Sequence, residues 1–225
     1  MINLKVGLTE KRYLILSVLD KFGIVTVDQI VKLTSFNRST IYYALREFEK
    51  KELIRKFKNM QKAVYLITKL GSEAIGDINF GFSKDERTPN FAIFRHSMLL
   101  NESVIFYREH FEEQARFEVE RELIAKFASE GLQRRKQIAN LPDFVIEIGD
   151  MKQAVEVELT RKSPAKLAKK LLNYKRLIEV GEYTHLIYLY QSLAIRRLVA
   201  KCAVDVGVEV TFGNLDEMLG GNIYV

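Results

Sequence analysis

The first third of the chain alternates short apolar stripes with polar turns. Apolar residues recur at helical spacing between Thr9, a candidate N-cap, and Gly23, a helix stop. A second stripe predicts a short helix over about 27–33. A polar turn at 34–37 then leads into a third helix over 38–50. Three short helices with a tight turn before the third predict a helix-turn-helix unit.

Two segments of strand character follow these helices. Residues 53–58 and 63–67 read as strands, and the basic segment 59–62 turns between them, which predicts a β-hairpin. Three helices followed by a hairpin resemble the winged-helix family. The segment 65–71 is similar to the Leu-Thr-x-x-Gly ending of many wings. The resemblance covers residues 8 to about 76 and implies a domain that binds double-stranded DNA.

The charge distribution agrees with a nucleic-acid partner for this part. The chain has 35 Lys and Arg against 29 Asp and Glu. Residues 1–76 hold 14 basic and 7 acidic residues, a net charge of +7, and the remainder holds 21 and 22, a net charge of −1. A winged helix used for protein–protein contact would not need seven surplus positive charges, so we expect DNA as the partner.

The third helix and the hairpin supply the candidate DNA-binding residues. The N-terminus of the helix would offer backbone N–H groups and hydroxyls to a phosphate, and residues one turn later would reach base edges. Lysines of the hairpin would contact the DNA backbone. The predicted residues are Arg38, Ser39, Thr40, Tyr42, Tyr43 and Arg46 on the helix, and Lys56, Lys58 and Lys62 on the wing.

The rest of the chain predicts a second domain over 91–225, after a linker at 77–90 that is rich in turn residues. Its first helix, about 91–113, is expected to pack across both domains or to form a contact in a homodimer. Strands and helices then alternate, which predicts an α/β (α+β) fold with helices on the faces of a mixed sheet. We expect helices at 120–127, 164–180 and 193–206, and strands at 144–148, 153–159, 185–190 and 208–212.

Acidic residues cluster where two of these strands meet. Pro142-Asp143 is followed after twelve residues by Glu156-Val157-Glu158. Because side chains alternate along a strand, Glu156 and Glu158 share one face. Three carboxylates this close repel one another unless a cation lies between them, so Mg²⁺ or Mn²⁺ is the expected cofactor. The alternative is structural, since Pro-Asp turns and alternating glutamates on a half-exposed strand are common.

This arrangement resembles the PD-(D/E)xK nuclease superfamily, whose core is a helix, a β-meander, a helix and a strand. The resemblance implies a restriction-endonuclease-like domain, and it adds Glu120 of the preceding helix as a further acid. Glu158 stands where the superfamily has its lysine, so Lys162 or Lys166 would supply that group. The implied catalytic residues are Asp143, Glu156, Glu158 and Lys162, and the implied metal ligands are Glu120, Asp143 and Glu156.

A second resemblance covers nearly the whole chain. A winged helix, Glu120-x-x-Leu123, Pro142-Asp143, Glu156-x-Glu158 and the segment Lys170-Leu-Leu-Asn-Tyr174 together look like the replication-relaxation family of plasmid mobilisation and relaxase-type proteins. This resemblance implies metal-dependent nicking, or binding, at a plasmid origin.

Other classes of protein are disfavoured by the composition. No apolar run approaches the length of a membrane span, the N-terminus lacks the layout of a signal peptide, and Cys202 is the single cysteine. We therefore expect a cytoplasmic protein with no membrane partner. Three functions remain open: a DNA-nicking enzyme, a non-catalytic DNA-binding regulator or accessory factor, and an effector-sensing regulator.

Overall fold

The chain forms two compact units. The computed structural model describes residues 7–59, 62–75, 90–129 and 141–220. One unit runs to Ile105 and the other extends from Phe106 to Ile223. The predicted linker at 77–90 lies largely outside the described residues. The division between the units falls inside a helix, α5 (Phe91–Phe111), that the sequence pattern assigned as a whole to the second domain.

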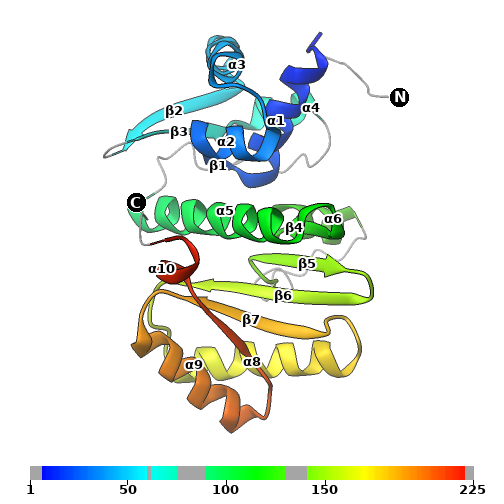
Figure 1. Ribbon diagram of the computed structural model, residues 1–225, viewed down its shortest axis with the longest axis vertical. Helices are drawn as coiled ribbons and strands as arrows, with labels where there is room; N and C mark the ends of the chain where they lie inside the picture. Colours follow the sequence, from blue (N-terminus) through cyan, green and yellow to red (C-terminus); the bar gives the residue numbers. More distant parts are fainter. Residues whose placement is uncertain (1–6, 60–61, 76–89, 130–140, 221–225) are drawn as a thin grey trace. The chain divides into compact units, whose positions relative to one another are not determined.

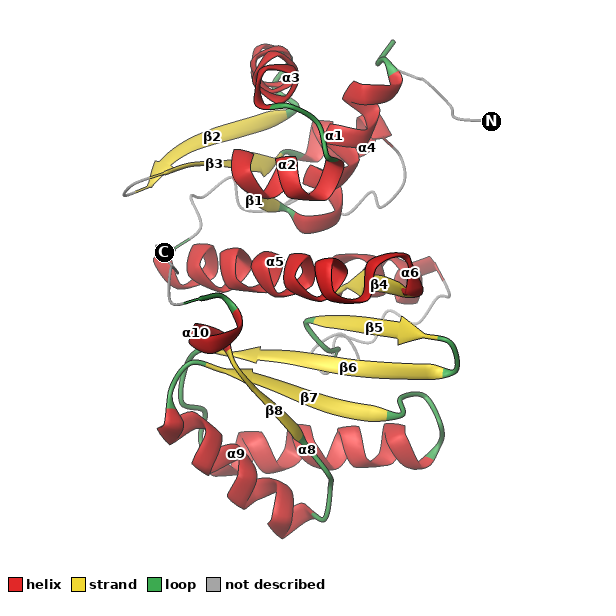
Figure 2. Ribbon diagram, in the orientation of Figure 1, coloured by secondary structure: helices red, strands yellow, loops and turns green. Residues whose placement is uncertain are grey.

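The first unit contains the predicted three helices and hairpin (Figures 1 and 2). A short strand before the second helix and a short helix after the hairpin were not predicted. The elements are α1 (Glu10–Phe22), β1 (Ile24–Thr26), α2 (Val27–Thr34), α3 (Arg38–Lys50), β2 (Ile54–Asn59), β3 (Lys62–Ile67), α4 (Lys69–Ile75) and the first part of α5 (Phe91–Phe111).

Local signals in the sequence explain where these helices begin and end. Gly23 ends α1 at a φ of 76°, which a residue with a side chain adopts only with strain. Thr9 stands at the start of α1 as expected, but its side chain makes no capping hydrogen bond. Thr26 and Gln29 form a capping box at the start of α2. Asn37 caps α3.

The three strands form an antiparallel sheet in the order β1-β3-β2. The segment after β3 shows why a wing ends in Thr-x-x-Gly. The Thr68 hydroxyl donates to the Leu53 carbonyl and accepts from the Gly71 N–H. A Cβ atom at Gly71 would lie 2.1 Å from the Leu53 carbonyl oxygen, so only glycine lets α4 approach the chain this closely.

The first part of α5 belongs to the core of the first unit. Phe94 and Met98 pack against Ile24 and the apolar face of β3. The buried Asn101 donates to the Ile24 carbonyl (2.7 Å) and to Gln29 Oε1 (3.2 Å). These contacts explain why the division between the units lies within α5.

The second unit is built on a five-stranded mixed sheet in the order β4-β5-β6-β7-β8. Strand β5 is antiparallel to both of its neighbours, β4 and β6, while β7 and β8 run parallel to β6. The elements are the 3-10 turn η1 (Glu112–Gln114), β4 (Ala115–Val119), α6 (Glu120–Ser129), β5 (Phe144–Ile148), β6 (Met151–Glu158), α8 (Pro164–Glu179), β7 (His185–Tyr190), α9 (Leu193–Val206), β8 (Thr211–Asn214) and α10 (Leu215–Met218).

Helices α8 and α9 lie on the same face of this sheet (Figure 1). Their apolar sides pack on strands β5, β6 and β7 in one core. Most predicted elements agree closely with those observed, and the predicted fold class is confirmed. The last strand lies at 211–214 rather than 208–212, and β4 and α4 were not predicted. Strand β1 and helix α10 also escaped prediction, because each is too short to show a period.

Candidate functional site

The exposed face of α3 carries the predicted helix residues. Its apolar side, with Ile41 and Leu45, is buried in the first unit. Tyr42 and Arg46 are exposed, and the Tyr43 side chain is 70% exposed. A side chain this exposed takes no part in the core of the unit. The face combines aromatic, hydroxyl and cationic groups, which can stack, donate hydrogen bonds and contact phosphate.

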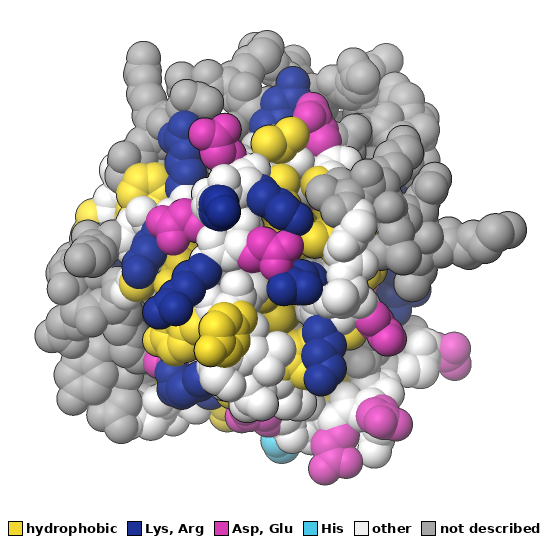
Figure 3. Space-filling model, turned by 90° about the horizontal axis from the view of Figure 1, so that it is seen from above, with side chains coloured by type: hydrophobic (Ala, Val, Ile, Leu, Met, Phe, Trp, Pro, Cys, Tyr) yellow, Lys and Arg dark blue, Asp and Glu magenta, His cyan; other side chains and the backbone are white. Residues whose placement is uncertain are grey.

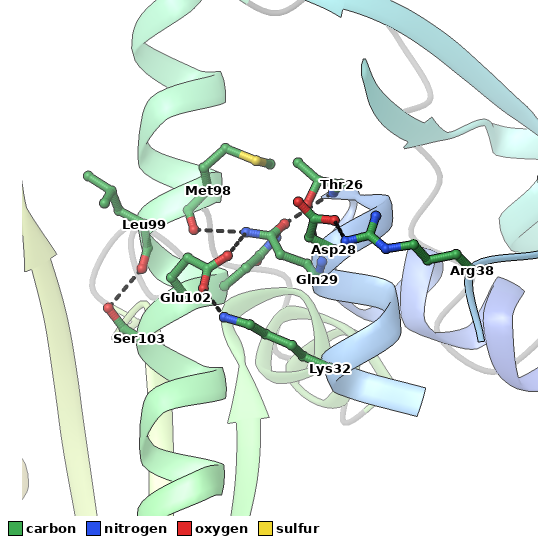
Figure 4. Close-up of polar contacts among 10 residues, drawn as sticks. Thr26, Asp28, Gln29, Lys32, Arg38, Met98, Leu99, Glu102 and Ser103 are labelled. Carbon is green, nitrogen blue, oxygen red and sulfur yellow. Dashed lines mark hydrogen bonds and ion pairs between the residues drawn. The ribbon is translucent and has the colours of Figure 1, made fainter. Parts of the chain in front are cut away.

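The N-terminus of α3 is already organised by its own cap. Asn37 Oδ1 accepts hydrogen bonds from the Thr40 N–H and from the Ser39 hydroxyl, both at 2.8 Å. Arg38 is exposed, and its guanidinium lies 2.6 Å from Asp28 of α2 (Figure 4). Arg38 is therefore held at the surface by an ion pair, which costs little to exchange for a phosphate contact.

Helix α2, which precedes α3, is anchored by a polar network to α5 (Figure 4). Gln29 Nε2 donates to the Met98 carbonyl (3.2 Å) and to Glu102 (3.1 Å), and Lys32 pairs with the same carboxylate at 3.0 Å. Because Gln29 and Asn101 are buried, these bonds fix the position of α2. The helix-turn-helix therefore depends on α5 for its support.

On the wing, the structure describes the side chain of only one of the three predicted lysines. Lys56 is exposed on β2, with its ammonium 5.9 Å from the centre of the Tyr65 ring. The side chains of Lys58 and Lys62 lie outside the described residues. The backbone of both residues belongs to the paired strands β2 and β3, as predicted.

Basic and acidic side chains mix on the surface of this unit (Figure 3). Several cations are paired: Arg12 and Lys51 both contact Glu47, at 2.6 and 2.9 Å. In the described part of the chain, Arg46 makes no ion pair, so its charge is not neutralised by a neighbour. Together with the exposed Lys50 of the last turn, Arg46 supplies unpaired positive charge on α3.

In the second unit, the predicted acids meet at the ends of β5 and β6. Asp143 precedes β5, and its Oδ2 accepts a hydrogen bond from the Val157 N–H of β6 at 2.6 Å. The Asp143 carbonyl accepts from the N–H of Glu120, at the start of α6. Asp143 thus connects two strands and a helix.

Glu156 is the centre of a buried ionic cluster. Its side chain is only 2% exposed, and it lies on the same strand face as Glu158. Lys170 of α8 donates to Glu156 Oε2 at 2.5 Å, and the Tyr174 hydroxyl donates to Oε1. Both oxygens of this carboxylate are therefore bound by α8.

Glu158 is 4% exposed and is paired differently. Its Oε2 lies 2.5 Å from Lys162 Nζ, but the angles between them do not make a hydrogen bond, so the contact is an ion pair only. The hydroxyl of the fully buried Tyr188 likewise has no hydrogen-bond partner in the described chain. The sequence left open that these glutamates alternate along a half-exposed strand with no functional role. A half-exposed strand is not observed here, since β6 is buried on both faces from Ala154 to Glu158.

The electrostatics of the cluster follow from its burial. Burial and the charge of Asp143 raise the pKa of Glu156 to about 7, against the lowering effect of Lys170. Burial alone would lower the pKa of Lys170, but Glu156 and Asp143 outweigh it and the pKa is raised. Burial, and then the neighbouring Glu156, also raise the pKa of Tyr174. Lys170 therefore remains an ammonium at neutral pH, and Glu156 exchanges a proton near neutrality.

The residues as placed do not fit a Mg²⁺ or Mn²⁺ ion. Such an ion needs several carboxylate oxygens free to bind it, whereas both oxygens of Glu156 are taken by protein donors. Among the described residues, no three acidic, histidine or cysteine side chains are grouped to hold a metal. The predicted ligands Glu120, Asp143 and Glu156 accordingly do not form such a group.

The two residues that contact Glu156, Lys170 and Tyr174, were singled out in the sequence only as the ends of a motif and were given no role at this site. Lys162 was the predicted lysine, and it contacts Glu158 instead; the other candidate, Lys166, is exposed. Lys170 and Tyr174 are four residues apart on α8, on the face that also buries Leu171. A lysine within an otherwise apolar helical stripe was the available signal.

Comparisons with known proteins give little guidance. No family model matches the chain, and no curated protein matches it. A structure concerning the regulation of DNA binding of Bordetella bronchiseptica BpsR by 6-hydroxynicotinic acid has 14% identity and a TM-score of 0.31, over 59% of this chain and 77% of that one. A MepR-like protein complexed with pseudoligands has 20% identity and a TM-score of 0.30, over 55% and 73%. Likeness at this level carries no argument about function.

Within the described ranges, no helix combines the length and the apolar character needed to cross a bilayer.

Proposed function

We propose that this protein binds double-stranded DNA through its winged helix. The observation that carries the proposal is the solvent face of α3, where the exposed Tyr42, Tyr43 and Arg46 stand beside an exposed Arg38. A helix of this kind following a short turn is the element that enters the major groove in helix-turn-helix proteins. The net charge of +7 over residues 1–76 supplies the attraction to phosphate.

Fluorescence anisotropy with a labelled duplex, over 50–300 mM salt, tests this proposal. Arg46→Ala is expected to weaken binding, because it removes an unpaired cation that would reach a base edge, and Arg38→Ala is expected to reduce the slope of log K against log salt by about 1, because it removes a phosphate contact. Lys69→Ala removes an exposed cation from α4 and is the matched control, expected to bind as the wild type. A loss in Lys69→Ala equal to those in the arginine variants, or binding that does not depend on salt, would refute the proposal.

For the second unit we propose two candidate roles. Nicking is supported by the Pro142-Asp143 and Glu156-x-Glu158 motifs and by the position of Asp143 and Glu156 at adjacent strand ends, although these residues as placed do not fit a metal ion. A non-catalytic role, as a regulator or as an accessory factor in replication or mobilisation, is favoured by the complete pairing of Glu156 with protein donors. The two roles make opposite predictions for the same assay.

Supercoiled plasmid incubated with Mn²⁺ separates the two roles. A nicking enzyme converts it to open circles, and Asp143→Asn and Glu156→Gln, which keep the size of the side chains, are expected to abolish the activity. A protein that binds the plasmid without nicking it has the non-catalytic role. Nicking that survives both substitutions would come from a contaminant.

The biological setting we propose is plasmid or mobile-element processing. It is supported by the order of the motifs from Glu120 through Asp143 and Glu156 to Tyr174. That support comes from short motifs alone, since no family model matches the chain. A homodimer stays a prediction that sedimentation would test.

A further inference from the structure

The helical layer of the second unit is strongly basic although the unit as a whole is not. Residues 161–206, which include α8 and α9, hold 10 Lys and Arg against 3 Asp and Glu. No acidic residue occurs between 159 and 178 or between 183 and 204. The acids that balance this charge lie elsewhere in the unit, so the positive charge is concentrated in one layer.

Part of this charge is used inside the protein. Lys162 and Lys170 neutralise buried glutamates of β6, and Lys175 donates to the Val206 carbonyl. Arg161, just before α8, is exposed. Six cations of the two helices are exposed as well, and none of them is paired with a carboxylate within the described ranges. They are Lys166, Lys169 and Arg176 of α8 and Arg196, Arg197 and Lys201 of α9.

The outward position of these cations follows from the helical period. On α8, Lys169 and Arg176 are seven residues apart and lie opposite Leu171 and Tyr174, which face the sheet. On α9, Arg197 and Lys201 are separated by one turn, and the buried residues of that helix lie on its other side. Because α8 and α9 share one core on one face of the sheet, both basic stripes belong to the layer's solvent side.

We propose that this solvent side of α8 and α9 is a second DNA-binding surface that contacts the phosphate backbone. A single small anion would need converging cations, whereas these are spread along the helices: Lys169 and Arg176 are about 10 Å apart along the axis, at 1.5 Å per residue. A row of unpaired cations fits the regularly repeated charge of a duplex. The choice of DNA rather than another polyanion rests on the proposed function of the first unit.

The experiment uses the full chain and a 40-base-pair duplex. Arg197→Gln and Lys169→Gln are each expected to lower the slope of log K against log salt by about 0.9, which corresponds to about a fivefold loss of affinity at 0.15 M salt, counted from 1 M salt. Arg116→Gln, which removes an exposed charge from β4 of the same unit, is the matched control and is expected to leave binding unchanged. All three substitutions are at exposed positions, and unchanged thermal unfolding would verify that each variant is folded.

The outcomes separate this proposal from the DNA-binding proposal for the winged helix. If Arg46→Ala weakens binding and the α8 and α9 variants match Arg116→Gln, the second surface is refuted and the winged-helix proposal stands. If the α8 and α9 variants weaken binding and Arg46→Ala binds as the wild type, the second surface stands and the winged-helix proposal fails. If the variants lose binding to poly-glutamate but keep wild-type binding to the duplex, the surface serves an acidic protein and the proposal is overturned.

Discussion

Glu156 predicts an unusual dependence of stability on pH. Its carboxyl group has a pKa of about 7 in the folded protein, against an ordinary value of 4.5, because it is buried beside Asp143. The folded state therefore binds a proton more tightly than the unfolded state. The stability contributed by this proton is fully present below pH 4.5 and is lost as the pH rises through 7.

The size of the effect follows from the difference of about 2.5 pKa units. At about 1.36 kcal/mol per unit, the free energy of unfolding should fall by roughly 3 kcal/mol between pH 4.5 and pH 8. Lys170 does not add to this change, because its raised pKa keeps it charged throughout that range. In Glu156→Gln the titrating group is absent, so this part of the pH dependence should disappear.

Urea unfolding from pH 5 to pH 8 measures the effect, with tyrosine fluorescence as the signal since the chain has no Trp. Because two units need not unfold in one step, the quantity compared is the difference between wild type and variant. Glu179→Gln, an exposed position at the end of α8, is the control and should follow the wild type. A wild-type stability that is flat or rises over this range, or a Glu156→Gln profile parallel to it, would refute the reasoning.

Two further substitutions test the packing. Lys170→Met should lower the free energy of unfolding by about 3–5 kcal/mol at pH 8, because it leaves Glu156 buried without a counter-charge, and by less at pH 5, where Glu156 holds a proton. Lys169→Met is its exposed control, and equal effects of the two would contradict the buried pair. Gly71→Ala should cost roughly 1–3 kcal/mol in urea unfolding, since its Cβ would collide with the Leu53 carbonyl; a neutral result would show that α4 moves easily.

Several features were determined by the sequence because they depend on neighbouring residues. The helical period from Thr9 to Gly23, the turn before α3 and the alternation of Glu156 with Val157 are local, and the structure reproduces each of them. The exposure of Tyr43 could be predicted for the same reason, since Ile41 and Leu45 define the buried side of its helix.

The tertiary structure decided what each of these groups contacts. Glu156 and Glu158 are buried because β6 is the central strand of the sheet and α8 covers the face to which they point, and both depend on segments far apart in the chain. Lys170 rather than Lys162 binds Glu156 because α8 crosses β6 at a position that no local pattern encodes; the two partners are fourteen residues apart. Likewise, the first part of α5 supports the winged helix through Asn101, which bonds to Ile24, 77 residues earlier in the chain. The sequence alone determined which chemical groups each element presents, whereas packing determined whether those groups meet water, each other or a partner.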